Sequence, residues 1–477
     1  MSIKQTTSTP KGGTLPLGKT RTYTEVVEFL NSHWAQETDA KSAERMKKLD
    51  KALGTPSQKV PTILIAGTNG KSLTTHFATK LFKEEGILVG ALYAPHILTY
   101  NERFFVDSEF IANKNFTDLG NEVINAAEEH GIDATTQEIL VAMAFLHFVQ
   151  NNVAVALMEV EHGGISHPLA AIASPKIVAL TRITAQDADQ EGQALDPAFN
   201  EYIGLVKEGA HLVSADQNKT NLKRMSDYAK QVKAHWEMPI RKLTVLPYPF
   251  EQLHGRCAAL AERIASIFIN ELAPQDLSLH EETSLLMKKK GQRGRPTLEA
   301  KRQSELNPKR TLEHFWRETS NSLVGRFQIF DKEKPTILID NAANIDAFKN
   351  FLLGVRLMHY QRSLKGLTLV VGCHQETLDY QEFLRQIRYF FKKTSGHIVV
   401  CPVPTKEGVF YSSWDAEKVA NDMKELKIKA RAASNFKEAL ELAKKSVTDR
   451  HGLVAIVGCS ALLAEYWNSK GIKKLQG

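Results

Sequence analysis

The chain has 477 residues, 43% hydrophobic and 24% charged, with a net charge of +7, and this composition excludes a largely disordered, collagen-like or coiled-coil protein. No apolar run reaches the roughly 18 residues of a membrane helix, and residues 1–19 lack the apolar core of a signal peptide, so no membrane partner is expected. The four cysteines are far apart and form no CxxC pair, which predicts neither a disulfide framework nor a zinc site and indicates a cytoplasmic protein.

The first predicted elements are a strand, a glycine-rich turn and a helix. Thr62–Ala66 is an apolar strand, and an amphipathic helix follows the turn. The residues between them that would contact phosphates are Gly67, Thr68, Asn69, Gly70, Lys71 and Ser72. Glycines let backbone N–H groups wrap a phosphate, Lys71 would reach the outer phosphates and Ser72 could ligate Mg²⁺. Ile65 stands where the usual motif begins with glycine, but the flanking strand and helix favour nucleotide binding over an incidental glycine turn.

Strands alternate with amphipathic helices along the rest of the chain, which predicts parallel α/β architecture in two halves. The other predicted strands are Ala154–Glu159, Ile177–Thr181, Thr336–Asp340, Thr368–Gly372, His397–Cys401 and Leu453–Val457. The predicted organisation is a flexible amino terminus (1–19), a nucleotide-binding domain (20–273), a polar basic insertion (274–319) and a second domain (320–477).

The segment between Lys288 and Arg310 contains nine basic and two acidic residues, which account for the whole net charge of the chain. Within it, Arg293–Pro296 resembles the core of an AT-hook, which inserts arginines into a narrow minor groove. One such tetrapeptide without interleaved aromatic residues favours a solvated insertion, so no nucleic-acid partner is expected. The segment could also attract an anionic substrate.

Several motifs resemble those of the folylpolyglutamate and dihydrofolate synthases, in the Mur ligase superfamily. The phosphate loop is similar to their Gly-Thr-Asn-Gly-Lys sequence. Ala94-Pro95-His96-Ile97, followed by Tyr100-Asn101-Glu102-Arg103, is similar to their Ser-Pro-His-Leu and Tyr-x-Glu-Arg block. The other similar blocks, in the family's order, are Leu53–Pro56, Thr135–Phe148, Val155–Gly164, Gly325-Arg326, Asp340–Asn344 and Val457–Ser460.

The resemblance implies an α/β, Mur ligase-like fold, with an N-terminal P-loop ATPase domain on a mainly parallel sheet and a smaller C-terminal Rossmann-like domain. It also implies an ATP-dependent amide ligase that adds L-glutamate to a folate or dihydropteroate carboxylate through an acyl phosphate. ATP and one or two Mg²⁺ ions would be required, and a monomer is expected. This chemistry depends on positioning and charge neutralisation rather than on a protein nucleophile.

The resemblance also implies the metal ligands. Glu159 ends an apolar strand beside the phosphate loop, where its carboxylate would bind Mg²⁺ together with Ser72. Lys207 lies in a segment similar to the family's Ile-Ala-x-Glu-Lys-Ala-Gly, whose lysine is carbamylated and serves as a ligand. Asp187 would supply a further oxygen. The alternatives are a solvated strand-end glutamate and an ordinary surface lysine.

In the second half, the resemblance implies that Arg326 clamps the ATP phosphates, Asp340 contacts the ribose and Asn344 contacts the nucleotide. A helix cap is the other interpretation of a strand-end aspartate. His96 would act near the active site, or it is a turn histidine. Glu102 and Arg103 beside it could pair on the surface.

The chain departs from the family pattern at several positions. The family's Gly-Gly-Arg-x-Asp-Ala-Thr-Asn block is replaced by Gly163–Pro168, and Ala343 replaces the histidine of Asp-Gly-Ala-His-Asn. The metal-binding Asp-His falls at Gln186-Asp187, or at Asp187-Ala188 with a shift of one residue. Asp187 or Asp189 could supply an oxygen ligand there, and His167 could fill an empty ligand position. Two alternatives therefore stay open: a Mur-type ligase for a different carboxylate, and a catalytically weakened nucleotide-binding regulator.

Overall fold

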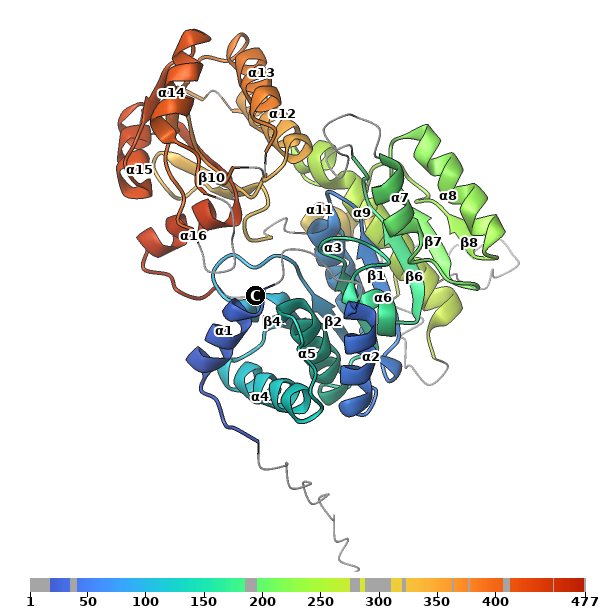
Figure 1. Ribbon diagram of the computed structural model, residues 1–477. Helices are drawn as coiled ribbons and strands as arrows, with labels where there is room; N and C mark the ends of the chain where they lie inside the picture. Colours follow the sequence, from blue (N-terminus) through green and yellow to red (C-terminus); the bar gives the residue numbers. More distant parts are fainter. Residues whose placement is uncertain are drawn as a thin grey trace, which may run out of the picture.

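A computed structural model describes residues 18–34, 41–184, 195–274, 284–287, 310–319, 323–362, 364–375, 378–405, 412–448 and 450–475. The chain forms two α/β units, each built on its own sheet (Figure 1). Asp187 and residues 288–309, including the segment that resembles an AT-hook, lie outside the described residues.

The first sheet has the strand order β4-β3-β2-β5-β1-β6-β7-β8. Its strands are β1 (Thr62–Ala66), β2 (Val89–Leu92), β3 (Phe104–Val106), β4 (Glu109–Phe110), β5 (Val155–Glu159), β6 (Pro175–Leu180), β7 (His211–Ser214) and β8 (His235–Glu237). Pairing is parallel from β2 to β8, and β3 and β4 add an antiparallel hairpin at one edge. The three strands predicted in this half are confirmed, with small shifts at their ends.

Helices cover both faces of this sheet. One face packs against α1 (Tyr23–Ser32), α2 (Ser42–Ala52), α4 (Asn113–Glu129), α5 (Thr136–Gln150), α6 (Pro168–Ile172), α7 (Leu195–Ile203) and α8 (Lys219–Gln231). The other face packs against α3 (Lys71–Glu84), α9 (Phe250–Ile267) and α11 (Leu312–Glu318). Along β1, Leu64 belongs to the first of these cores and Ile63 and Ile65 to the second. Because both faces are buried, the strand is apolar at every position from Ile63 to Ala66 and does not alternate.

Helix α11 differs from the prediction of a polar insertion over 274–319. Trp316 is fully buried, its ring centroid lies 5.7 Å from that of Phe77 on α3, and its indole N–H donates to Glu262 on α9 over 3.2 Å. The end of the insertion is therefore part of the first core. Helix α11 was not predicted because it is short and charged residues surround Phe315 and Trp316 in the sequence.

The second sheet has the order β13-β12-β11-β14-β10-β9. Its strands are β9 (Gln328–Phe330), β10 (Thr336–Asp340), β11 (Leu367–Gly372), β12 (His397–Val400), β13 (Ala430–Ala432) and β14 (Leu453–Gly458). Only β9 is antiparallel among these described strands. The helices α12 (Ile345–Gln361), α13 (Tyr380–Phe391) and α14 (Ala416–Glu425) cover one face, and α15 (Phe436–Lys445) and α16 (Ser460–Ser469) cover the other. The four strands predicted in this half are confirmed.

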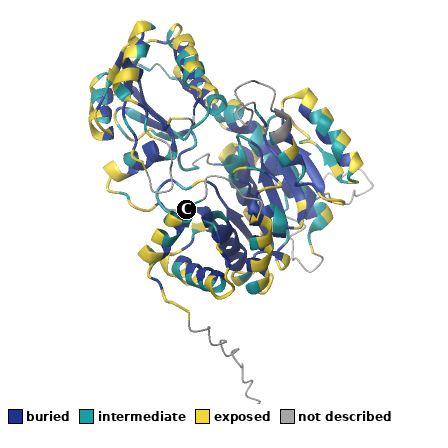
Figure 2. Ribbon diagram, in the orientation of Figure 1, coloured by how far each residue is buried: buried dark blue, intermediate teal, exposed yellow. Residues whose placement is uncertain are grey.

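The central strands of both sheets and the helix faces packed against them are buried, and many of the exposed residues lie on the outward faces of the helices (Figure 2). The short turns are η1 (Pro56–Gln58), η2 (Tyr100–Arg103) and η4 (Phe268–Leu272). Within the described residues, none of the helices has the length and apolarity needed to cross a lipid bilayer. The predicted fold class, two α/β domains with a mainly parallel first sheet, is confirmed.

Three buried histidines lead us to expect a stability that depends on pH. Burial lowers the pKa of His147 and His167 to about 4 and that of His254 to about 3. An unfolded histidine has a pKa of about 6.5, so the unfolded chain takes up protons first as the pH falls. Each histidine then stabilises the fold fully above pH 6.5, and this stabilisation is lost as the pH falls towards the folded pKa.

Urea unfolding between pH 7.5 and 4.5 would measure this effect. The variant His254→Gln is expected to lose less stability over this interval than the wild type, because one buried protonation site is gone. His130→Gln, at an exposed position, is the matched control and should follow the wild type. If the free energy of unfolding changed equally with pH in all three proteins, His254 would not be buried as a neutral group.

Candidate active site

The phosphate loop joins β1 directly to α3. Gly67 and Gly70 have φ angles of 122° and 98°, in the left-handed region that favours glycine. A Cβ on Gly67 would lie 2.4 Å from the Thr181 hydroxyl, so only glycine fits there. The Lys71 ammonium donates to the Gly67 carbonyl over 2.6 Å and closes the loop. The loop therefore presents backbone N–H groups at the start of α3, the arrangement that binds phosphates.

Glu159 lies beside this loop at the end of β5, the strand next to β1. One carboxylate oxygen accepts from the Ser72 hydroxyl over 3.0 Å and from the Ala94 N–H over 3.2 Å. The other is buried and makes no hydrogen bond within the described part of the chain. Burial raises the pKa of Glu159 to about 7. A buried carboxylate oxygen with open lone pairs, next to a serine hydroxyl, is a donor set that fits Mg²⁺.

Arg326 reaches the same place from the second domain. Its guanidinium lies 3.5 Å from the Ser72 hydroxyl, and burial lowers its pKa, although Asp340 opposes that shift. Asp340, at the end of β10, accepts the Phe327 N–H over 2.6 Å, and burial raises its pKa to about 7. Asp340 thus holds the turn that carries Arg326, a positioning contact that the sequence interpretation did not include.

Asn344 connects the second domain to the phosphate loop. Its side-chain oxygen caps α12 by accepting the Ala347 N–H over 2.8 Å, and its amide donates to Asn69 over 2.8 Å. The Asn69 amide donates in turn to Asp346 over 2.8 Å. Asp346 also forms an ion pair with Arg182 over 2.8 Å. These four side chains form an interdomain contact at the loop itself.

A cavity of about 380 Å³ lies between the two domains at this contact. The residues predicted to bind nucleotide that line it are Thr68, Asn69, Gly70, Lys71, Ser72, Arg326, Asp340 and Asn344. The structure therefore brings together nearly all of the predicted nucleotide ligands from both halves of the chain. Lys71 and Arg326 provide positive charge, which suits a phosphate compound.

The loop after Pro95 corrects the interpretation of Glu102. Glu102 is 7% exposed, and its carboxylate accepts three consecutive backbone N–H groups, those of Ile97, Leu98 and Thr99, over 2.7–2.9 Å. The alternative of a surface pair with Arg103 is therefore excluded, because the loop folds around Glu102 and buries it. Its role is to fix the shape of this loop.

Arg103 is also buried and pairs with Glu161, two residues beyond β5, over 2.8 Å. Although burial acts in the opposite direction, the Arg103 charge lowers the pKa of Glu161 to about 2. His96 accepts from Arg103 over 3.0 Å and lies against Tyr100, with ring centroids 4.4 Å apart. In this structure His96 therefore supports Arg103, as a turn histidine would, and the sequence interpretation missed Glu161.

We expect Glu161→Gln to destabilise the fold by about 3 kcal/mol, because it leaves the Arg103 charge buried without its partner. Urea unfolding at pH 7 measures this change. Replacing both residues, with Arg103→Met added, removes the unpaired charge and should restore part of the lost stability. Equal stability of Glu161→Gln and the wild type would contradict a buried pair.

The structure does not bring Lys207 to this site, contrary to the prediction. Lys207 is exposed, and its ammonium donates to the Ala173 carbonyl over 2.7 Å. Both residues precede strands, β7 and β6, so they lie at the amino-terminal edge of the parallel sheet. Glu159 lies at the opposite, carboxyl-terminal edge. Lys207 cannot share a metal ion with Glu159 in this arrangement.

A different register explains the mismatch. Aligned on its Glu and Gly, the Glu-Lys-Ala-Gly part of the motif falls on Glu201–Gly204 and puts Tyr202 at the lysine position. Glu201 accepts the Gly164 N–H over 3.1 Å, so this segment does contact the loop that follows Glu159. Tyr202 is 5% exposed. The match at Lys207 rested on Ile203, Lys207 and Gly209, with Val206 in place of the glutamate before the lysine.

The other expected metal ligands do not complete a second site. The ring Nδ1 of His167 accepts the Leu169 N–H over 3.2 Å and caps α6, so this nitrogen is not open to a metal. Asp187 lies outside the described residues. Ser72 and Glu159 are the predicted metal ligands that the structure brings together.

Comparisons with known proteins place these observations in a family context. No protein-family model matches the chain. It is 29% identical over 223 residues to the dihydrofolate synthase/folylpolyglutamate synthase of Bacillus subtilis, a match that covers 46% of this chain and 48% of that protein. The chain spans about half the length of the curated relatives it matches.

Solved structures match over nearly the whole chain. Mycobacterium tuberculosis folylpolyglutamate synthase complexed with ADP superposes with a TM-score of 0.74 at 18% identity, covering 95% of this chain and 99% of that one. The Yersinia pestis bifunctional folylpolyglutamate synthase/dihydrofolate synthase complexed with AMPPNP and Mn ion has a TM-score of 0.71 at 20% identity, covering 95% and 100%. The resemblance inferred from the motifs is confirmed, and the fold is that of these proteins.

Proposed function

We propose that this protein is an ATP-dependent amide ligase that adds L-glutamate to the carboxylate of a folate or dihydropteroate. The observation that carries the proposal is the meeting of Ser72, Glu159 and Arg326 at a phosphate loop between two domains. The similarity to dihydrofolate and folylpolyglutamate synthases supports this substrate class. It favours the folate ligase over a Mur-type ligase for another carboxylate.

The reaction would use two displacements. The acceptor carboxylate oxygen attacks the γ-phosphorus of ATP, ADP leaves, and an acyl phosphate forms. The glutamate amine then attacks the acyl carbon, loses a proton and expels inorganic phosphate. Each step needs oriented reactants and neutralised phosphate charge more than it needs a protein nucleophile.

The residues of the chain provide these requirements. The N–H groups of the loop and the Lys71 ammonium would bind the β- and γ-phosphates. Arg326 would stabilise the charge on the transferred phosphoryl group from the second domain. Ser72 and Glu159 would hold Mg²⁺, which neutralises phosphate charge when bound. Asn69 and Asn344 would keep both domains engaged around the nucleotide.

ADP release from purified protein with ATP and Mg²⁺ tests the proposal. Dihydropteroate plus glutamate, tetrahydrofolate plus glutamate, and no acceptor are compared. Release that requires both the pterin and glutamate is the expected result. ATP binding without turnover on any carboxylate would overturn the proposal in favour of a nucleotide-binding regulator, which is the alternative suggested by Ala343 at the family's histidine position.

A further inference from the structure

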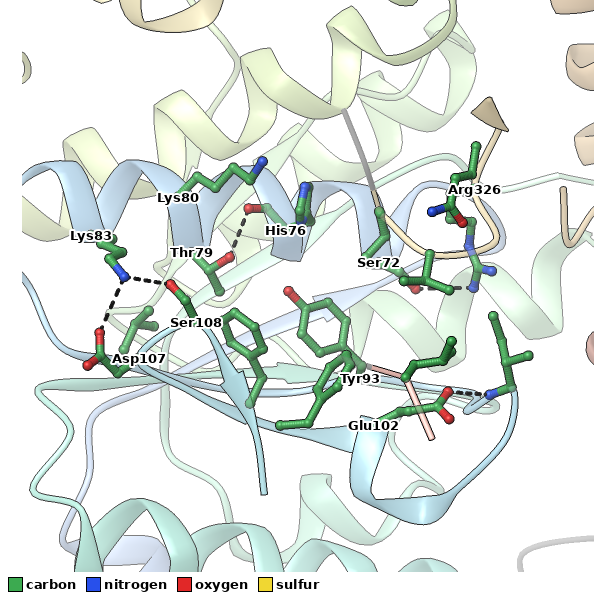
Figure 3. Close-up of a pocket in the computed structure, with 18 of the residues that line it drawn as sticks. Ser72, His76, Thr79, Lys80, Lys83, Tyr93, Glu102, Asp107, Ser108 and Arg326 are labelled. Carbon is green, nitrogen blue, oxygen red and sulfur yellow. Dashed lines mark hydrogen bonds and ion pairs between the residues drawn. The ribbon is translucent and has the colours of Figure 1, made fainter. Parts of the chain in front are cut away.

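A cluster of histidine and glutamate side chains lies away from the proposed active site, at one edge of the first sheet. Figure 3 shows the active-site side, where Ser72 and Arg326 meet beyond the carboxyl-terminal ends of the parallel strands. The cluster instead begins at His211, the first residue of β7, next to the edge strand β8 (Figure 1). Its other members are Glu237, the last residue of β8, and Glu271, in the turn η4 that follows α9. A ligand bound here would be separate from the nucleotide and its metal ion.

The pairing of β7 with β8 puts the strand residues of this cluster on one face of the sheet. His211 lies opposite His235, and Val213 lies opposite Glu237, in parallel register. Because side chains alternate along a strand, all four point to the same face. Val213 belongs to the core that α9 covers, so this is the face beneath α9. The helix continues into η4, a turn of π-helix, and this turn brings Glu271 over the two strands.

The donor atoms of His211, Glu237 and Glu271 converge, and all three lie within 4.8 Å of one another. The Nδ1 atom of His211 is 2.9 Å from a carboxylate oxygen of Glu237, and its Nε2 atom is 4.0 Å from one of Glu271. Donors bound to one Zn²⁺ ion lie about 3.3–3.6 Å apart, because the bonds are about 2.0–2.2 Å long. The three side chains would therefore have to close by only about 1 Å to bind one ion.

The charges around the cluster favour a cation. Glu237 and Glu271 carry two negative charges, and Arg263, which pairs with the other oxygen of Glu237, carries one positive charge. The balance is one negative charge beside His211, which is only 5% exposed. Within the described part of the chain, the Glu271 carboxylate forms no hydrogen bond. Its side chain is 43% exposed, so it can turn towards an ion without disturbing the core.

The donor types indicate which kind of metal would bind. Mg²⁺ and Ca²⁺ prefer oxygen donors alone, whereas Zn²⁺ binds histidine and glutamate side chains together. His235 stacks on His211 with ring centroids 4.6 Å apart, and it is exposed, so a second imidazole lies beside the first. Two histidines and two glutamates are donors that suit the tetrahedral coordination of Zn²⁺.

We propose that His211, Glu237 and Glu271 form a Zn²⁺ site, distinct from the Mg²⁺ position at Ser72 and Glu159, that joins the edge strand β8 to the end of α9. The inference does not depend on the proposed ligase function. The ion would take the place of the proton that His211 and Glu237 share in their hydrogen bond. Because the three residues are far apart in the chain, the unfolded protein would not bring them together, so bound Zn²⁺ would stabilise the fold.

Isothermal titration calorimetry with ZnCl₂ tests the site, with excess Mg²⁺ present to occupy the position at Glu159. The wild type is expected to bind Zn²⁺, and Glu271→Gln to bind it at least about tenfold more weakly, the usual loss when a group at a metal site is removed. Glu129→Gln, at an exposed position at the end of α4, removes one carboxylate elsewhere and should bind like the wild type. Zn²⁺ at about a hundredfold excess over its dissociation constant should raise the melting temperature of the wild type by about 5 °C.

His211→Gln is expected to lose this binding, and its melting temperature without Zn²⁺ shows whether the variant is folded. Glu271 is partly exposed, so Glu271→Gln tests the site even if His211→Gln does not fold. Equal Zn²⁺ affinity in the wild type and Glu271→Gln would overturn the proposal, as would the absence of Zn²⁺ binding to the wild type. Equal losses in Glu271→Gln and Glu129→Gln would also overturn it, because a defined site requires a difference between them.

Discussion

Lys71→Ala is expected to abolish ADP release, with a loss of at least about a hundredfold, the usual cost of removing one donor to a developing phosphate or oxyanion charge. The Lys71 ammonium is held at the phosphate loop by the Gly67 carbonyl, 2.6 Å away, so its charge is already in place before a nucleotide binds. Alanine is compatible with the start of α3 and leaves the loop glycines unchanged. The measurement is steady-state ADP release at saturating ATP.

Lys59→Ala, at an exposed lysine before β1, is the control and should retain wild-type turnover. The melting temperature of both variants shows whether the fold is intact. Substantial turnover by a folded Lys71→Ala protein would mean that the loop does not hold the transferred phosphate. The assignment of the active site to this loop would then be wrong.

Glu159→Ala is expected to raise the Mg²⁺ concentration needed for half-maximal activity by about tenfold to a hundredfold, the range seen when groups supporting a metal site are lost. The physical reason is the carboxylate itself, since Ser72 alone offers the ion one neutral oxygen. High Mg²⁺ should recover part of the activity. ADP release measured as a function of Mg²⁺ concentration gives the shift.

Glu159→Gln separates charge from hydrogen bonding in this test. Its amide oxygen can still accept from the Ser72 hydroxyl and the Ala94 N–H, as the carboxylate does. If glutamine behaves like alanine, the negative charge is what matters, as a metal ligand requires. A glutamine variant with the wild-type Mg²⁺ dependence would instead give Glu159 a purely structural role.

The sequence predicted the strands of five or more residues because both faces of each sheet are covered, which makes strands such as β1, β11 and β14 almost entirely apolar. Among the described strands, seven were not predicted: β2, β3, β4, β7, β8, β9 and β13. Each has at most four residues, which is too short for a clear pattern, although β2 and β7 are fully buried inside the first sheet. Trp316 was missed for a related reason, since a helix of seven residues, most of them charged or polar, has too few apolar positions to show a period.

The site was predictable where its residues are close in sequence. The phosphate loop was predicted from the strand before it and the helix after it, and Glu159 from its position at the end of an apolar strand. The pairs Asn69–Asn344 and Arg182–Asp346 join residues far apart in the chain, and no local pattern encodes such contacts. Glu102 looked like half of a surface ion pair because its environment depends on how the backbone turns around it. Lys207 shows that a partial match, here Ile203, Lys207 and Gly209, does not fix the register of a motif.

The contact between the phosphate loop and the second domain has a consequence for how this protein is assayed. Part of that contact is the ion pair between Arg182 and Asp346, and the Arg182 side chain is about half exposed. Charges in such a position are screened at physiological ionic strength, where the Debye length is about 8 Å. We therefore expect this ion pair to weaken as the salt concentration rises, and the contact between the phosphate loop and the second domain to weaken with it. Assays of ADP release would then be comparable only at one fixed ionic strength.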